Sequence, residues 1–145
     1  METFLLPPAL ADEIIAHARQ AYPEEACGLV AGRDGAGVAL YRGHNVSPTP
    51  TIAFELDTET LARQLEFEDQ GLTLAAIYHS HPAGPETPSP VDVARAYYPD
   101  TVALICSLAR PSGPVLRGFR IAGRRVREVA VVESETNEEL TSAGR

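Results

Sequence analysis

Apolar side chains recur at every fourth position near the start of the chain, at Leu10, Ile14, Ala18 and Tyr22. Because residues four apart lie on one face of a helix, this spacing predicts an amphipathic helix over residues 8–21. Pro8 suits the first turn of such a helix, and Pro23 ends it because proline lacks the N–H that another turn would need. The helix therefore presents one apolar stripe that must pack against another element.

Short apolar runs bounded by glycine, proline and polar turn residues follow, and each predicts a β-strand. They cover residues 27–31, 38–43, 52–56, 74–78, 102–107, 115–121 and 126–132. A loop rich in proline, serine and threonine, residues 46–51, separates the second run from the third. The last two runs form a hairpin over Gly123, where the missing side chain suits a tight turn.

A second helix is predicted after the strand over residues 52–56. Asp57 can accept a hydrogen bond as its N-cap, and Gly71 can close it in the left-handed conformation that glycine tolerates. Leu61 and Leu65 lie four residues apart and are expected on one face of this helix.

A third helix begins after a loop rich in proline and glycine, residues 82–88. Ser89 fits the N-cap, Pro90 the first helical position and Asp92 the third, and together they form a strong start signal. Helices and strands thus follow one another without a repeat or a long linker. Residues 1–132 are expected to form one α/β domain, and the polar, acidic residues 133–145 a disordered tail.

Composition and charge narrow the class of function. Of the 145 residues, 44% are hydrophobic and 22% charged, as in ordinary soluble domains. The net charge of −8 and the absence of a basic stripe argue against a nucleic-acid partner. No apolar run approaches the length of a membrane span, so we expect a cytoplasmic protein that does not bind membranes.

The two cysteines, Cys27 and Cys106, lie within apolar runs and belong to no Cys-x-x-Cys pair. Cysteine behaves as a small hydrophobic residue in such surroundings, so we expect both to be buried. A disulfide between them is not expected in a cytosolic protein. The sequence does not decide whether either has a redox role.

The strand over residues 74–78 continues into His79-Ser80-His81, the most informative segment of the chain. In an extended strand, side chains two residues apart leave the same face with Cα atoms about 6.5 Å apart, so both imidazoles can reach one ion. Asp92, with ten residues between it and His81, offers an oxygen ligand. Two nitrogens and one oxygen leave a fourth tetrahedral position open, as in catalytic zinc sites.

Simpler interpretations exist for these residues. The histidines could be polar residues at a strand end, and Ser89 and Asp92 could serve only as a helix cap. The cap is nevertheless compatible with metal binding, because it would root the carboxylate in a rigid first turn. His17 and His44 lie outside the motif and are expected to be structural or exposed.

A zinc hydrolase also needs a base that takes a proton from water and returns it to the leaving group. Glu24, Glu25 and Glu86 are all candidates, and spacing alone does not choose among them. Two other zinc signatures, His-Glu-x-x-His and the zinc deaminase motif, are absent from the sequence.

The combined pattern resembles the JAMM (MPN+) metalloprotease family. Its motif is an upstream glutamate, then His-x-His-Pro, then Ser-x-x-Asp, matched here by residues 79–82 and 89–92. In the family's first block the catalytic glutamate stands two positions before a Cys-Gly pair, which selects Glu25. Asn45 and Phe54 also fall where a minimal member has similar residues. The resemblance spans about residues 5–132.

This resemblance implies a fold and an activity. The fold is a central mixed β-sheet flanked by helices, like that of cytidine deaminases, with Zn²⁺ at the edge of the sheet. The activity is that of a peptidase or isopeptidase acting at the C-terminal end of ubiquitin-like proteins. The chain has no room for the long insertions of eukaryotic deubiquitinases. It therefore resembles compact prokaryotic members that act on small sulfur-carrier proteins, for example by releasing cysteine.

The corresponding mechanistic hypothesis gives each residue a role. His79, His81 and Asp92 hold zinc, Glu25 moves the proton, and Ser89 donates a hydrogen bond to the oxyanion. The partner is a carrier with a C-terminal Gly-Gly, since glycines let an extended backbone approach the metal closely. The alternatives are a non-catalytic zinc module that binds ubiquitin-like partners, or a zinc hydrolase of small amides. The leaving amine and the oligomeric state, with a homodimer as one option, stay open.

Overall fold

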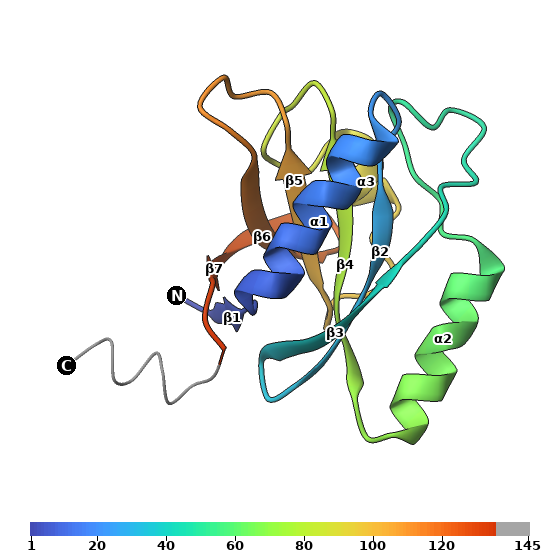
Figure 1. Ribbon diagram of the computed structural model, residues 1–145, viewed down its shortest axis with the longest axis vertical. Helices are drawn as coiled ribbons and strands as arrows, with labels where there is room; N and C mark the ends of the chain where they lie inside the picture. The colour runs from blue at the N-terminus through green and yellow to red at the C-terminus, as the bar shows by residue number, and fades with distance from the viewer. Residues whose placement is uncertain (136–145) are drawn as a thin grey trace.

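The computed structural model describes residues 1–135, which fold around a seven-stranded β-sheet that closes on itself (Figure 1). The strands are β1 (Thr3–Leu5), β2 (Cys27–Arg33), β3 (Ala36–Arg42), β4 (Thr73–His81), β5 (Val102–Ser107), β6 (Val115–Ala122) and β7 (Arg125–Val132). Their spatial order is β1-β3-β2-β4-β5-β6-β7. β1 is parallel to β3 and β7, and β4 to β5, whereas the other neighbours are antiparallel. The expected mixed sheet flanked by helices is confirmed, but its closure through the three-residue β1 was not predicted.

The helix α1 (Pro8–Ala21) covers one face of the sheet, and α2 (Thr58–Asp69) covers the other (Figure 1). Ile14 and Ala18 of α1 are fully buried against a core that includes Tyr78 of β4. On the opposite face, Phe67 of α2 packs with Leu29 of β2. β4 runs between the two cores, so its alternate side chains face different layers.

The predicted bounds of the first helix are confirmed, but the last residue of its apolar stripe lies outside it. Tyr22 is the C-cap and is 61% exposed, because the chain turns away from the helix before Pro23. The second helix begins at the predicted cap, with the Asp57 side chain accepting a hydrogen bond from Thr60 N. Of its apolar residues, Leu65 is 69% exposed, whereas Phe67 is buried. Phe67 offers a larger apolar surface, and this fixes the rotation of the helix.

The strand predicted over residues 52–56 is absent. Residues 51–55 form a turn and irregular chain, and only Asn45 and Leu56 make an isolated bridge. The cause is the Asn45 side chain, whose Nδ2 donates to the carbonyl oxygens of Pro50 and Ala53 at 3.3 and 3.0 Å. These bonds fold the segment around Asn45 instead of leaving it extended. Ile52, an apolar residue that favoured the strand, is 69% exposed.

The remaining elements agree with expectation. β4 extends through both histidines of the motif, and β5 has the predicted bounds. β6 and β7 pair as a hairpin in which Gly123 has a φ of +63°. The third helix, α3 (Pro90–Ala94), has Ser89 as its N-cap. β7 ends at Val132, and most of the expected tail, residues 136–145, lies outside the described residues.

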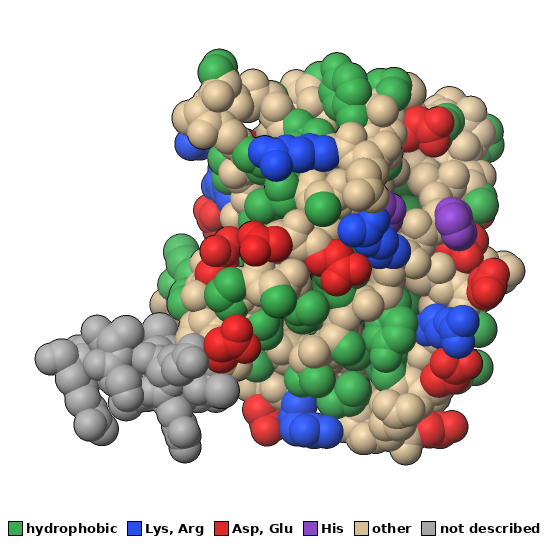
Figure 2. All heavy atoms as spheres, viewed as in Figure 1, with side chains coloured by type: hydrophobic (Ala, Val, Ile, Leu, Met, Phe, Trp, Pro, Cys, Tyr) green, Lys and Arg blue, Asp and Glu red, His purple; other side chains and the backbone are tan. Residues whose placement is uncertain are grey.

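Both cysteines are buried and free, as their apolar surroundings indicated. Burial raises the pKa of Cys27 to about 12 and that of Cys106 to about 11, so both are thiols at neutral pH. Acidic and arginine side chains are interspersed on the face shown in Figure 2. Within the described residues, none of the helices has the length and apolar character needed to span a membrane.

Candidate metal centre

β4 delivers two histidines to the site from its carboxyl end. The strand is paired on both sides, to β2 and to β5, so this end is enclosed, and His79 and His81 are only 3% and 4% exposed. Ser80 between them leaves the opposite face of the strand. There its Oγ accepts a hydrogen bond from Ala26 N at 2.8 Å. Because side chains alternate along the strand, the imidazoles of His79 and His81 lie on one face and the Ser80 side chain, which bonds to Ala26, lies on the other.

α3 delivers a carboxylate to the same place. Ser89 Oγ accepts from Asp92 N at 3.1 Å, and Asp92 Oδ2 accepts from Ser89 N at 2.9 Å, which is a complete capping box. The cap turns the Asp92 side chain back over the start of the helix. The same Oδ2 faces the imidazoles of His79 and His81.

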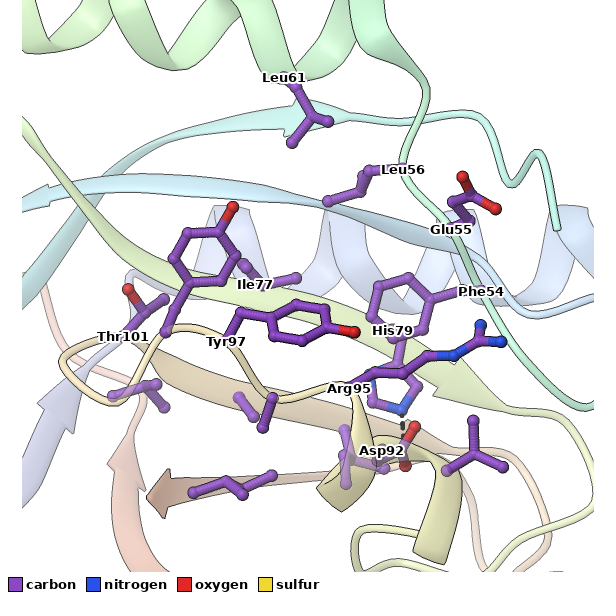
Figure 3. A pocket seen from close by; sticks show the side chains of 17 residues that line it. Phe54, Glu55, Leu56, Leu61, Ile77, His79, Asp92, Arg95, Tyr97 and Thr101 are labelled. Atoms are coloured by element: carbon purple, nitrogen blue, oxygen red, sulfur yellow. Dashed lines mark hydrogen bonds and ion pairs between the residues drawn. The ribbon is translucent and has the colours of Figure 1, made fainter. Parts of the chain in front are cut away.

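Three potential ligand atoms form a small triangle. His79 Nε2 lies 3.1 Å from His81 Nε2 and 3.1 Å from Asp92 Oδ2, and His81 Nε2 lies 3.0 Å from Asp92 Oδ2. Ligands of a tetrahedral zinc with usual bond lengths are about 3.3 Å apart, so this triangle is close to a preformed face of such a site. Figure 3 shows His79 and Asp92 meeting at the end of β4.

The orientation of both rings is set by contacts outside the triangle. His81 Nδ1 lies 2.7 Å from the carbonyl oxygen of Pro85. A carbonyl only accepts hydrogen bonds, so Nδ1 carries the proton and Nε2 of the neutral ring offers its lone pair to a metal. The ring of His79 stacks on Phe54, with centroids 4.5 Å apart and planes inclined by 23°.

Glu25, two residues before β2, lies beside the triangle. Its backbone N donates to Pro50 O at 2.8 Å, and its carbonyl accepts from Asn45 Nδ2 at 3.0 Å. One ligand-type atom from each of Glu25, His79 and His81 lies within 4.8 Å of the other two. Glu25 Oε1 is buried without a hydrogen-bond partner among the described residues. An orphaned buried carboxylate oxygen fits a site that takes a cation and its water.

The other two glutamates considered as a base point elsewhere. Glu24 is exposed, and the carboxylate of Glu86 binds Arg110, with Nη2 and Oε1 2.8 Å apart. Glu25 is the one of the three that the structure places beside the histidines.

The remaining histidines do not enter the cluster. His17 Nδ1 lies 2.7 Å from the hydroxyl of the buried Tyr78, on the α1 face of the sheet. His44 is exposed, and its backbone N donates to Asp57 Oδ1 at 2.8 Å. Both have the structural or exposed character that the sequence favoured.

Burial and mutual contact shift the pKa values in the cluster. Burial raises the pKa of Glu25. Burial alone would lower the pKa of His81, but its hydrogen bonds to Asp92 and to the Pro85 carbonyl outweigh this and raise the pKa. Burial likewise opposes ionisation of Asp92, yet its hydrogen bonds with both imidazoles lower its pKa. The cluster thus favours a positive charge between its carboxylates, which a divalent cation would supply.

An apolar cavity of about 540 Å³ opens beside the cluster, with His79 and Asp92 at one end (Figure 3). Its walls come from β4, β5, α2, α3 and the segments before α2 and after α3. They include Phe54, Leu56, Leu61, Ile77, Val91, Arg95, Tyr97, Tyr98 and Ile105. Figure 3 shows Tyr97 directed along the cavity toward His79. No local sequence signal predicts this cavity, because segments far apart in the sequence and without a common motif build it.

Asn45 also has a larger part in the site than its position in the sequence indicated. Its Nδ2 donates to the carbonyls of Glu25 and Ala53, both at 3.0 Å, while its Oδ1 accepts from Glu55 N at 3.1 Å. One side chain therefore fixes the backbone of Glu25 and that of the segment carrying Phe54. A lone asparagine between a glycine-histidine pair and a proline-rich loop is the only local signal for this role.

Comparison with known proteins gives a family and several relatives. Residues 7–122 match the family described as prokaryotic homologues of the JAB domain. Desampylase of Haloferax volcanii is 37% identical over 127 residues, which cover 83% of this chain and 88% of that protein. CysO-cysteine peptidase of Mycobacterium tuberculosis is 37% identical over 131 residues, covering 86% and 88%. The probable TtuB-protein conjugate cleaving protease of Thermus thermophilus is 41% identical over 92 residues, covering 63% and 62%.

Solved structures agree with the sequence relatives. A protein from Desulfitobacterium hafniense, determined in solution, superposes with a TM-score of 0.81 at 36% identity and covers 94% of this chain and 97% of its own. A JAB1/MPN domain protein from Archaeoglobus fulgidus has a TM-score of 0.59 at 17% identity, with coverage of 91% and 100%. The second similarity supports the fold alone.

Proposed function

The chain belongs to the prokaryotic JAB-domain family, the JAMM family that its motif resembles, and we propose that it is a zinc-dependent peptidase or isopeptidase. The bond that it hydrolyses follows the C-terminal glycine of a small ubiquitin-like or sulfur-carrier protein. The observation that carries this proposal is the convergence of two imidazoles and a carboxylate beside a buried glutamate with an orphaned oxygen.

In this proposal His79, His81 and Asp92 hold the metal. The donor set of two imidazole nitrogens and one carboxylate oxygen is typical of catalytic zinc, and it leaves a position for solvent. The triangle of 3.0–3.1 Å and the proton on His81 Nδ1 support the assignment. When bound, zinc would polarise the scissile carbonyl and lower the pKa of a coordinated water.

Glu25 is the proposed general base and acid. Its carboxylate lies close to both histidines, and within residues 1–135 its Oε1 makes no hydrogen bond, so that oxygen can receive a proton. Burial raises the pKa of the Glu25 carboxyl above its usual value, so it holds a proton more readily than an exposed glutamate does. Glu25 then delivers this proton to the departing amine.

Ser89 is the proposed donor to the oxyanion. Its Oγ accepts from Asp92 N, and this leaves the hydroxyl hydrogen free to point toward the substrate. Its position at the N-cap of α3 holds the hydroxyl in place while the carbonyl oxygen gains charge.

The apolar cavity supports a protein tail as the substrate. His79 and Asp92 line the cavity and Glu25 does not, so the acyl side of the scissile bond fits the cavity and the leaving amine fits the side of Glu25. A Gly-Gly end would bring an extended backbone close to the metal, with larger apolar residues farther along the cavity. Two relatives are named for cleaving CysO-cysteine and TtuB-protein conjugates, which agrees with such tails.

The setting proposed for this reaction is the cytoplasm, with a small carrier protein as partner and no nucleic acid or membrane. The net charge of −8 and the interspersed surface charges argue against a nucleic-acid partner. The leaving amine is a cysteine α-amine, a lysine side chain or the α-amine of an ordinary peptide.

Mass spectrometry tests the proposal directly. The zinc-loaded protein is incubated with the host's small Gly-Gly carriers, prepared both as cysteine adducts and as lysine conjugates. Release of free carrier from either form supports the proposal, and the form that is cleaved identifies the leaving amine. Intact carriers in both forms, with zinc bound to the protein, would contradict it. Glu25→Gln is the inactive control, and Glu24→Gln is the matched exposed control.

A further inference from the structure

The loop of residues 82–88 joins the two elements that carry the ligand triangle. It leaves β4 at His81 and enters α3 at Ser89, and it supplies the Pro85 carbonyl that accepts from His81 Nδ1 at 2.7 Å. Prolines at positions 82, 85 and 88 remove three of its backbone N–H donors. Gly84 N donates to His81 O at 3.1 Å, so one turn of the loop is held by its own backbone. The position of Pro85 therefore needs support from side chains.

Glu86, the next residue, supplies such support. Its carboxylate is 18% exposed and forms a two-pronged contact with Arg110, through Nη2 at 2.8 Å and through Nε. Arg117 of β6 approaches the same carboxylate, with Nη1 and Oε1 3.5 Å apart. Glu86 thereby ties the loop to the segment after β5 and to the hairpin of β6 and β7.

Arg117, which links Glu86 to the hairpin of β6 and β7, is itself held in place by other contacts. Arg117 binds Glu128 of β7 by two hydrogen bonds, Nε to Oε2 at 2.9 Å and Nη2 to Oε1 at 2.8 Å. Its guanidinium also lies over the ring of Phe119, 5.4 Å from the centroid. Isolated exposed ion pairs contribute little, but bidentate pairs joined in a network hold their members in one geometry.

We propose that Glu86 is a positioning residue that acts through the Pro85 carbonyl to keep the proton of His81 on Nδ1 and Nε2 free for the metal. Partners of this kind, one step beyond a metal ligand, fix its tautomer and its orientation. This inference rests on the proposed role of His81 as a ligand. It also gives a function to the glutamate that sequence reasoning considered as a base.

The test compares Glu86→Ala with Glu66→Ala, which removes a similar Glu–Arg pair on the exposed face of α2, where Arg63 Nη1 and Glu66 Oε2 are 3.0 Å apart. The first readout is the tautomer of His81 in the metal-free protein, from long-range ¹H–¹⁵N spectra recorded at a pH where the ¹⁵N shifts show the ring to be neutral. The second is the apparent Kd for zinc, from competition with a chelator.

We expect Glu86→Ala to give a mixture of His81 tautomers and to raise the zinc Kd by about tenfold, because loss of such partners typically costs 10- to 100-fold. Arg110→Ala should shift both readouts in the same direction, and Glu66→Ala should shift neither. Wild-type values for Glu86→Ala, or equal shifts in Glu86→Ala and Glu66→Ala, would overturn the inference. The tautomer readout needs no metal, so it judges Glu86 even if the carriers prove not to be cleaved.

Discussion

Ala26 and Ser80 exchange two hydrogen bonds across neighbouring strands: Ala26 N donates to Ser80 Oγ at 2.8 Å, and Ser80 N donates to Ala26 O at 3.0 Å. Each of these residues is next to a group of the site. Ala26 follows Glu25, and Ser80 lies between the two histidines. This pair of hydrogen bonds therefore holds the proposed base and the proposed ligands at a fixed separation.

The Ser80 hydroxyl should consequently matter for stability. Ser80→Ala leaves the buried N–H of Ala26 without a partner, and such a loss typically costs about 1–3 kcal/mol. We expect the free energy of unfolding, measured by urea titration, to fall by that amount. Ser112→Ala, in an exposed loop, is the control and should change it by less than about 0.5 kcal/mol. Equal values for the two variants would show that Ser80 does not anchor the site.

Replacing the proposed base should separate catalysis from metal binding. Glu25→Gln keeps the size of the side chain but removes its ability to take a proton. We expect kcat to fall by about 10²- to 10⁴-fold, the usual contribution of acid–base catalysis, while zinc content stays at the wild-type level. Carrier cleavage and metal analysis on the same sample check this. Full activity would remove Glu25 from the mechanism, and loss of zinc would make it a ligand.

Ser89 has two proposed tasks, and variants can tell them apart. Ser89→Ala removes both the N-cap and the hydroxyl, so the free energy of unfolding should fall by about 1 kcal/mol and kcat by about 10²- to 10³-fold. Ser89→Thr retains a capping oxygen and a hydroxyl and should restore most of both. Cleavage kinetics and urea unfolding of each variant give the answer. An alanine variant that loses stability but keeps wild-type kcat would leave Ser89 with the cap alone.

His17 should make stability depend on pH, independently of the metal centre. Burial, together with the nearby Arg42, lowers the pKa of His17 from 6.5 to about 4. The unfolded chain binds this proton more readily, so the His17 contribution to the free energy of unfolding should fall as pH drops from 6.5 to about 4. Urea unfolding across this range should show a shallower slope for His17→Gln than for wild type. Identical slopes would mean that His17 titrates normally in the fold.

The sequence predicted elements whose signals are local. Ser89, Pro90 and Asp92 predicted the start of α3, because a capping box is formed by two residues three positions apart. The strand carrying His79 was predicted for a similar reason, since a short apolar run that ends in β-forming residues favours a strand. Both elements position the ligand triangle, and their existence did not depend on distant contacts.

Features that depend on contacts between distant parts of the chain could not be predicted from the sequence. Asn45 folds residues 51–55 by bonding carbonyl groups that have no side-chain signature, so the apolar content of that segment indicated a strand that is absent. β1 is too short for a periodic signal, yet it closes the sheet by pairing with β7, more than a hundred residues later. The cavity wall at Tyr97 is set by how the chain after α3 packs against β4 and β5.

The central claim is that His79, His81 and Asp92 hold one zinc ion while Glu25 stays outside its coordination shell. Glu25 also lies close enough to both histidines to compete with Asp92 as the third ligand, so the claim can fail in a definite way. Anomalous diffraction at the zinc edge from zinc-loaded crystals decides between the two. The account predicts one peak per chain, about 2.0–2.2 Å from both Nε2 atoms and an Asp92 oxygen, with solvent in the fourth position. A peak bound by Glu25 in place of Asp92, or no peak at this triangle, would contradict it.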